Sequence, residues 1–180
     1  MRILRENCSG LVIDIQEKLY PVMEGKEALL ANCIKFLEGL GLLGIPTVFT
    51  QQYTRGLGPT IREIRSLYPS FTYVEKGSFS CLDEPVYADY LQLSGKSTIL
   101  ITGIESHVCV LQTAVDLQEK GWHPVVISDC ISSRNPAEKQ IAMGRFHQEG
   151  IRVSTVESVL FELTRSAAAA EFKAISKLIK

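Results

Sequence analysis

A cysteine near the middle of the chain lies where a buried strand is predicted to end and a helix to begin. The apolar run 97–103 stops at a glycine, and helical spacing of apolar residues extends from 106 to 120, so Cys109 falls in the first helical turn. The positive end of a helix dipole favours a thiolate, and open α/β folds bind ligands where their strands end. Both features predict that Cys109 is an ionised nucleophile.

Two further reactive side chains stand at the predicted ends of other strands. Asp14 ends the apolar run that begins at Gly10, and Lys76 follows a short β-rich run. Strands of a parallel sheet all end at one edge, so we expect Asp14, Lys76 and Cys109 to converge there. A carboxylate, an ammonium and a thiol match the roles of a base, a cation that tunes its neighbours, and a nucleophile.

The elements that must position these groups alternate along the whole chain. Strands are predicted at 10–15, 45–50, 71–75, 97–102, 124–128 and 151–155. Helices are predicted at 24–43, 60–67, 84–93, 106–120, 136–148 and 166–180, the last opening with the alanine patch 167–170. Strands separated by helices pair in parallel through crossover connections. The sequence therefore predicts an α/β fold: one three-layer α/β/α domain over residues 1–180 with a six-stranded, mostly parallel sheet.

Composition and charge narrow the classes of function. The chain has 180 residues, of which 46% are apolar, and a formal net charge of -1, which argues against nucleic acid or an anionic membrane as partner. Its apolar runs are strand-sized, and its first seven residues lack the apolar segment of a secretory signal. The five irregularly spaced cysteines indicate reduced thiols and a cytoplasmic location.

Several common motifs are missing. The chain has no G-x-G-x-x-G, no G-x-x-x-x-G-K-[ST] and no G-x-S-x-G, which argues against dinucleotide oxidoreductases, P-loop nucleotide hydrolases and serine hydrolases. It has three histidines and neither H-x-H nor H-E-x-x-H, so a histidine-based metal centre is not expected. The sequence predicts neither a metal nor a cofactor.

Three motifs taken together resemble the isochorismatase-like cysteine hydrolases, a family that includes nicotinamidases and N-carbamoylsarcosine amidohydrolases. They are D-x-Q at 14–16, K-x-x-F-S at 76–80 and G-I-x-x-x-x-C-V at 103–110, and the resemblance runs from residue 7 to about residue 163. It implies the strand order 3-2-1-4-5-6 and a catalytic set of Asp14, Lys76 and Cys109. It also implies a homo-oligomer: a dimer, a tetramer or a larger assembly.

The resemblance implies a reaction as well. Family members have a cis peptide bond four residues before the cysteine, here between Ile104 and Glu105, and an oxyanion hole formed by the backbone N–H groups of Glu105 and Cys109. Asp14 would accept the thiol proton while Lys76 stabilises the anions. Cys109 would attack a small amide or related C–N substrate, and water activated by Asp14 would hydrolyse the thioester.

The segment 50–59 departs from the nicotinamidase pattern. It reads T-Q-Q-Y-T-R-G-L-G-P where nicotinamidases have the aspartate and histidines that bind a metal, which implies the metal-free subgroup. Gln51, Gln52 and Tyr53 of this loop are candidates to line a substrate pocket by hydrogen bonding and stacking, and a purely structural loop is the alternative. The expected pocket residues are Gln16, Gln51, Tyr53, Phe79 and Ser80.

Two other functions remain open from the sequence. A vinyl-ether hydrolase, as in true isochorismatases, would use Asp14 as a general acid and would need no cysteine, so the presence of Cys109 favours the amide reaction. A catalytically idle binding or scaffold protein of the same fold is the other alternative. The intact set of Asp14, Lys76 and Cys109 argues against it, because an idle protein has no chemical use for a desolvated ion pair. The expected ligand is a small molecule.

Overall fold

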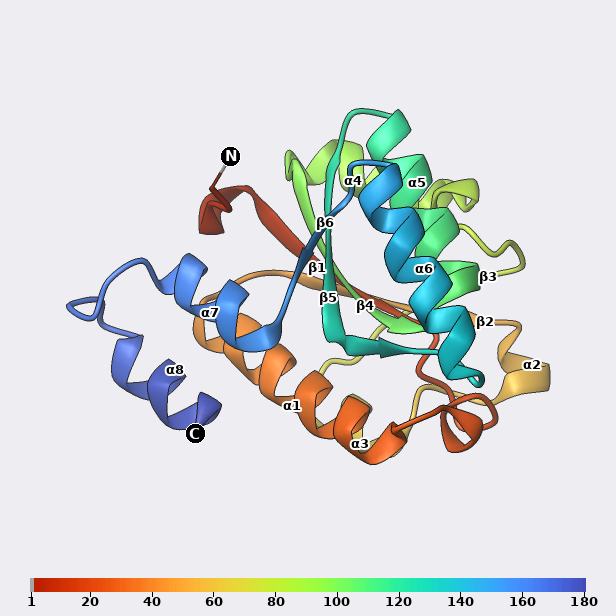
Figure 1. Cartoon of the computed structure of the whole chain (residues 1–180), viewed down its shortest axis with the longest axis horizontal. Helices are drawn as coiled ribbons and strands as arrows, with labels where there is room; N and C mark the ends of the chain where they lie inside the picture. The colour runs from red at the N-terminus through yellow and green to blue at the C-terminus, as the bar shows by residue number, and fades with distance from the viewer. Residues whose placement is uncertain (1) are drawn as a thin grey trace.

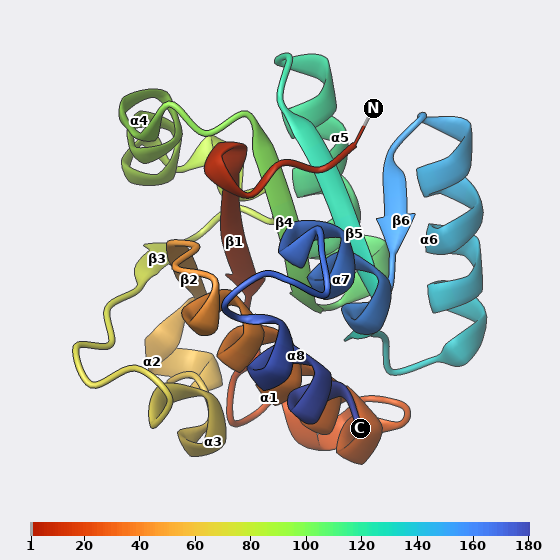
Figure 2. The ribbon, with the colours of Figure 1, turned by 90° about the vertical axis from the view of Figure 1, so that its left-hand side faces the viewer.

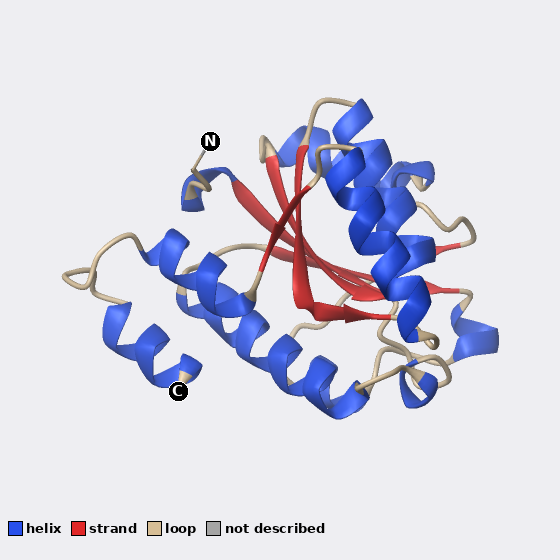
Figure 3. Cartoon of the chain, in the orientation of Figure 1, coloured by secondary structure: helices blue, strands red, loops and turns tan. Residues whose placement is uncertain are grey.

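A six-stranded parallel sheet lies between two layers of helices in the computed structural model, which describes residues 2–180 (Figures 1 and 3). The strands are β1 (Cys8–Ile13), β2 (Thr47–Gln52), β3 (Val74–Lys76), β4 (Thr98–Ile104), β5 (His123–Ser132) and β6 (Arg152–Ser154). All neighbouring pairs are parallel and the order is β3-β2-β1-β4-β5-β6. The parallel α/β fold predicted from the sequence is confirmed, as is the strand order that the resemblance implies.

The helices cover both faces of the sheet. They are α1 (Lys26–Leu42), α2 (Thr54–Leu57), α3 (Arg62–Arg65), α4 (Pro85–Ser94), α5 (Leu111–Glu119), α6 (Pro136–Gln148), α7 (Val156–Thr164) and α8 (Phe172–Ile179). The core under α4, α5 and α6 is separate from the core under α1 and α7, and Figure 2 shows α8 alongside α1. Among residues 2–180, no helix has both the length and the apolar character needed to cross a membrane.

The central strand β1 shows how the sequence builds two cores from one strand. Side chains of a strand alternate between the two faces of a sheet. Leu11 and Ile13 belong to the core under α4, α5 and α6, whereas Val12 belongs to the core under α1. All residues of β1 are buried because helices cover both faces of the sheet. The first side chain beyond this strand is that of Asp14, at the edge where the strands end.

The C-terminal part differs from the sequence prediction. The prediction omits α7, although its buried apolar residues recur at helical spacing and Thr155 caps its first turn by accepting the N–H of Ser158. The last helix begins at Phe172 and not at residue 166, and the alanine patch 167–170 forms turns. These alanines are mostly exposed, so helix propensity has no burial to support it, whereas Ile175 of α8 packs in the core.

The third strand is also shorter and later than predicted, covering Val74–Lys76 where the sequence predicts 71–75. Phe71 leaves the sheet and packs against the ring of Phe49, with ring centroids 4.9 Å apart. Aromatic packing therefore replaces strand pairing at this position. The displaced strand ends on Lys76, which still reaches the edge of the sheet where β1 ends.

Gly103 controls how closely two strands approach beneath that edge. It pairs with Ile13 of β1 and has a φ of +132°, in the region that favours glycine. A Cβ atom at this position would lie 2.1 Å from the carbonyl oxygen of Ile13, so a side chain does not fit without moving backbone. Because Asp14 directly follows Ile13, this close contact sets the spacing between Asp14 and the segment that follows β4.

Replacing Gly103 with alanine should therefore destabilise the protein strongly. We expect Gly103→Ala to lower the free energy of unfolding by about 2–5 kcal/mol, from the strained φ together with overpacking of backbone. Urea unfolding followed by circular dichroism measures the change. Gly144→Ala is the matched control, because Gly144 is exposed within α6 and has open space around it, and this change should be neutral or stabilising by about 0.5–1 kcal/mol. Equal midpoints for the two variants would contradict the close-contact argument.

Candidate active site

The carboxylate, the ammonium and the thiol lie together at the edge where the strands end. Asp14 follows β1, Lys76 is the last residue of β3, and Cys109 lies in the turn that follows β4. The Lys76 Nζ atom is 2.7 Å from Asp14 Oδ2 and 3.5 Å from Cys109 Sγ. The three residues stand at or beyond the ends of three different strands, and Asp14 and Cys109 both contact Lys76 directly.

The ion pair of Asp14 and Lys76 is completely buried, since both side chains have 0% of their surface exposed. Both members of the pair also have hydrogen-bond partners outside it. Asp14 Oδ1 accepts a hydrogen bond from the Thr50 hydroxyl at 2.8 Å. Lys76 Nζ donates to the carbonyl oxygens of Ser78 and Phe79 at 3.1 and 3.2 Å. A buried ion pair persists only when such partners satisfy both charges, so this is a highly specified arrangement.

The backbone at Asp14 is unusual for a residue with a side chain, because its φ is +53°. Aspartate tolerates this left-handed conformation better than most residues. The Asp14 carbonyl accepts the N–H of Gln16 at 2.8 Å, which closes a tight turn directly after β1. Non-glycine residues in this conformation concentrate at functional sites, where surrounding contacts hold them.

Cys109 sits in a π-helical turn, Ser106–Val110, that precedes α5; the sequence predicts one continuous helix there. The peptide bond between Ile104 and Glu105 is cis. The Glu105 carbonyl accepts the N–H groups of Val108 and Val110, at 3.1 and 3.2 Å. Val108 and Val110 lie on either side of Cys109 in the chain. The Glu105 carbonyl therefore bonds the N–H groups before and after that of Cys109.

Two side-chain contacts tie this turn to the loop that follows β5. The Glu105 carboxylate accepts the backbone N–H of Arg134 at 2.9 Å and its Nε–H at 3.2 Å. His107 Nδ1 lies 2.9 Å from the Ser133 hydroxyl, so this imidazole is engaged away from Cys109. Both contacts hold the turn that carries the thiol against the neighbouring strand.

The structure corrects the prediction that Cys109 is ionised at rest. Burial, together with the negative charge of Asp14, raises the pKa of the Cys109 thiol to about 12, and Lys76 only partly opposes this effect. Burial also raises the pKa of Asp14, against Lys76 and Thr50. For Lys76 burial acts to lower the pKa, but the charges of Asp14 and Cys109 raise it above its ordinary value. The sulfur therefore faces a nearly neutralised ion pair and stays protonated at neutral pH.

Among the expected pocket residues, Gln51 and Ser80 make hydrogen bonds away from the three reactive groups. Gln51 is buried, donates to the Thr60 hydroxyl at 3.1 Å and accepts from the Thr54 hydroxyl at 3.0 Å. The Ser80 hydroxyl donates to Asp116 and accepts the N–H that begins the next helical turn. Both side chains hold loops in place.

The other three expected pocket residues border Lys76 or its neighbours. Tyr53 is 59% exposed and donates its N–H to the Lys76 carbonyl at 3.1 Å, and Phe79 is 54% exposed. The Gln16 side chain is buried and bonds the backbone of Gln52 and of Gly58. Tyr53 and Phe79 thus bond Lys76 through their backbones, while both residues are more than half exposed.

Sequence reasoning named Gln51, Gln52 and Tyr53 together as loop residues that could line a pocket, and it did not single out Gln52 as a neighbour of Lys76. The carboxamide oxygen of Gln52 lies 2.6 Å from Lys76 Nζ and 3.9 Å from Cys109 Sγ. Strand periodicity was the available signal: Thr50 and Gln52 lie on one side of β2, where Thr50 contacts Asp14, and Gln51 lies on the other. Because Thr50 contacts Asp14, strand alternation makes Gln52, two residues later, a better candidate than Gln51 for contact with the reactive groups.

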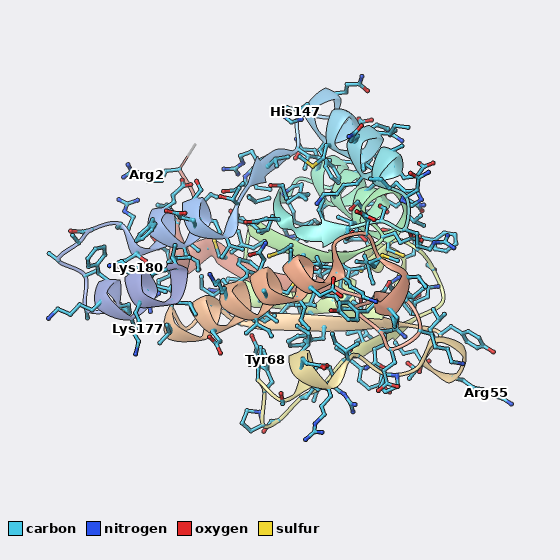
Figure 4. The ribbon with its side chains drawn as sticks, turned by 60° about the horizontal axis from the view of Figure 1, so that its bottom comes forward. Arg2, Arg55, Tyr68, His147, Lys177 and Lys180 are labelled. Carbon is cyan, nitrogen blue, oxygen red and sulfur yellow. The ribbon has the colours of Figure 1, made fainter. Side chains whose placement is uncertain are left out.

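The loop that follows β2 carries no cluster of metal ligands. Among residues 2–180, no group of three or more His, Cys, Asp and Glu side chains is arranged to hold a metal ion. Within this loop α2 contributes Arg55, whose side chain points outward from the body of the protein (Figure 4).

Known proteins share both the sequence pattern and the architecture. The profile of the isochorismatase domain family matches residues 10–158. Isochorismatase domain-containing protein 2A of Mus musculus is 35% identical over 99% of this chain and 85% of its own. The structure of MAR1 ribonuclease from Caenorhabditis elegans superposes with a TM-score of 0.93 and 31% identity, covering 99% of this chain and 92% of its own. The Escherichia coli YcaC product, described as an octameric hydrolase of unknown specificity, has a TM-score of 0.93 at 22% identity, covering 99% and 89%, and supports the fold alone.

Breaking the buried ion pair on one side should destabilise the protein more than removing both charges. Asp14→Asn leaves the Lys76 ammonium without its counter-charge, and we expect a loss of about 3–5 kcal/mol in the free energy of unfolding at pH 7. The double variant Asp14→Asn/Lys76→Met should recover part of that loss. Urea unfolding of Asp14→Asn, Lys76→Met and the double variant measures the coupling between the two residues.

An exposed ion pair provides the control for that experiment. Arg145 and Glu149 form a salt bridge of 2.9 Å on the surface of α6, and Glu149→Gln should cost less than about 0.5 kcal/mol. Two results would contradict the predicted coupling of the buried pair. The losses of unfolding free energy in the Asp14 and Lys76 single variants could sum to the loss in the double variant, or each could be as small as that of Glu149→Gln.

The raised pKa of Cys109 predicts how its alkylation depends on pH. Iodoacetamide reacts with the thiolate, whose fraction grows with pH up to a pKa of about 12, so the rate at Cys109 should rise continuously between pH 7 and pH 10. Peptide mapping by mass spectrometry assigns the modified residue. A rate that levels off near pH 7 would reveal a resting thiolate and overturn the assignment of a protonated thiol.

Proposed function

The chain belongs to the isochorismatase domain family, and from that premise we propose that it is a hydrolase of a small amide or related C–N compound, with Cys109 as nucleophile. The observation that carries the proposal is the buried ion pair of Asp14 and Lys76 in contact with the Cys109 thiol. A nucleophile, a base and a cation in mutual contact are the parts that thiol-dependent acyl transfer needs.

The first step follows from the protonation states. The thiol is neutral at pH 7, so its proton moves to the Asp14 carboxylate as sulfur attacks the carbonyl carbon. The S–C bond forms and the carbonyl electron pair moves to oxygen. Lys76 stays protonated and stabilises the sulfur while negative charge develops on it. The raised pKa of Asp14 makes this carboxylate a stronger proton acceptor than an exposed aspartate.

The turn that carries Cys109 supplies donors for the oxyanion. We assign this role to the backbone N–H groups of Glu105 and Cys109. The Glu105 carbonyl accepts the N–H groups of Val108 and Val110, the residues on either side of Cys109, and these hydrogen bonds shape the turn that joins the two donors. Two backbone donors aimed at a developing oxyanion stabilise the tetrahedral intermediate.

The second half of the reaction regenerates the thiol. The oxyanion collapses, the C–N bond breaks, and Asp14 returns its proton to the departing nitrogen. Water then attacks the thioester while Asp14 accepts one of its protons, and the products are an amine and a carboxylic acid. The released sulfur takes the proton back from Asp14, which restores the resting state.

One observation favours a second candidate, vinyl-ether hydrolysis. Burial raises the pKa of Asp14, which also suits a general acid that protonates a substrate carbon or oxygen. That reaction needs no thiol, so Cys109→Ala separates the two candidates. A third candidate, an idle binding or scaffold protein, predicts no turnover of any substrate.

We propose a homo-oligomer that acts on a small-molecule substrate in a reducing compartment such as the cytoplasm. The octameric description of the YcaC product supports assembly, and large exposed apolar side chains such as Val86 and Leu93 on α4 are compatible with it. All five cysteines are free thiols in the structure, which supports a reducing location.

A substrate screen with site variants tests the proposed function. Small primary amides, carbamoyl compounds and a vinyl ether are screened by thermal shift and product release, with an RNA oligonucleotide added because one structural neighbour is a ribonuclease. For an amide that is turned over, we expect Cys109→Ala and Asp14→Asn each to lower kcat/KM by at least about 1,000-fold. Intact-mass spectrometry should reveal an acyl adduct on Cys109.

Cys8→Ala is the matched control, since Cys8 is a buried cysteine at the opposite end of β1 from Asp14. Its kcat/KM should stay within about twofold of the unmodified protein. Full turnover by Cys109→Ala would reject the cysteine mechanism, and if that turnover is of the vinyl ether and still needs Asp14, the second candidate replaces it.

A further inference from the structure

A glutamine that the proposed reaction does not use contacts both the ammonium and the thiol. The Oε1 atom of Gln52 accepts a hydrogen bond from Lys76 Nζ at 2.6 Å, a shorter contact than the 2.7 Å between Lys76 and Asp14. The same oxygen lies 3.9 Å from Cys109 Sγ, within reach of the thiol proton. Gln52 is half-buried, whereas Asp14 and Lys76 are fully covered, so this carboxamide lies at the outer side of the cluster.

Its neighbours fix the orientation of that carboxamide. Gln52 Nε2 donates to the Gly77 carbonyl at 2.8 Å, while Oε1 faces the ammonium of Lys76. The reversed orientation would place an NH₂ group against an ammonium and an oxygen against a carbonyl. One orientation therefore satisfies all groups, and it presents an acceptor to both Lys76 and Cys109.

The backbone of Gln52 is held as firmly as its side chain. Gln16 accepts the Gln52 N–H at 2.7 Å and donates to the Gln52 carbonyl at 3.0 Å. Gln52 also pairs with Lys76 across β2 and β3. These contacts place the carboxamide before any substrate arrives, as a preorganised site requires.

We propose that Gln52 is a positioning residue of this reaction: as a neutral acceptor it holds the Lys76 ammonium between Asp14 and Cys109, an inference that rests on the proposed role of Cys109. Neutrality matters because of the charges already present. With an amide, the sulfur faces one carboxylate and one ammonium. With a carboxylate at this position it would face two carboxylates and one ammonium, and the added negative charge would disfavour the anionic sulfur.

The test measures the reactivity of Cys109 and needs no substrate. The rate of alkylation by iodoacetamide is measured at pH 9 for Gln52→Glu and Gln52→Met, with the modified residue mapped by mass spectrometry. We expect Gln52→Glu to slow alkylation at Cys109 by at least about tenfold, which corresponds to a rise of one unit in the thiol pKa. Gln52→Met should slow it less, because it loosens Lys76 without adding charge.

Gln118→Glu is the matched control for the added charge. Gln118 is exposed near the end of α5, nine residues after Cys109 and roughly 13 Å further along the helix direction. Its alkylation rate should stay within about twofold of the unmodified protein. Gln52→Glu keeps an acceptor for Lys76, so this variant is expected to fold even if Gln52→Met does not.

A purely structural role for Gln52 gives a different result. It would lower the midpoint of thermal unfolding while leaving the alkylation rate at pH 9 unchanged, and that outcome overturns the proposal. A faster rate in Gln52→Glu also overturns it. If the rates change as expected but no amide is hydrolysed by the unmodified protein, the positioning of Lys76 by Gln52 is supported and the hydrolase proposal is the one that fails.

Discussion

The buried ion pair of Asp14 and Lys76 is the constraint on which the rest of the site depends. Two opposite charges with no exposed surface are tolerable only when their attraction and their hydrogen bonds replace the lost water. That requirement explains why two neighbouring segments contribute partners: β2 contributes Thr50, and the loop that follows β3 contributes the carbonyls of Ser78 and Phe79. The loops at this edge of the sheet are therefore organised around one pair of charges.

The same pair determines the acid–base state of the thiol. A lone ammonium 3.5 Å away would favour the thiolate, but Asp14 cancels most of that charge and burial disfavours the anion. The thiol therefore rests in its neutral form, and in the proposed reaction it becomes anionic only as its proton moves to Asp14. This resting state slows oxidation and alkylation of the cysteine, because both reactions act on thiolates. It also makes the hydrogen-bond partners of Lys76 important for reactivity.

Much of the fold followed from the sequence because hydrophobic period and strand-helix alternation leave few topologies open. The errors occurred where local pattern competes with burial. The exposed alanines 167–170 have strong helix propensity but form turns, whereas α7 was overlooked although its buried residues recur at helical spacing. Phe71 has strand propensity but packs on another aromatic ring. In each case the contacts available in three dimensions outweighed the preference of the segment.

The sequence by itself determined which chemical groups stand at the ends of β1 and β3 and in the turn after β4, because a parallel sheet collects its strand ends at one edge. Tertiary structure alone decided their protonation, since burial and the distances between Asp14, Lys76 and Cys109 arise from packing. It also decided that Gln52 and not Gln51 meets the ammonium, because the direction of each side chain depends on the register of β2 against its neighbours.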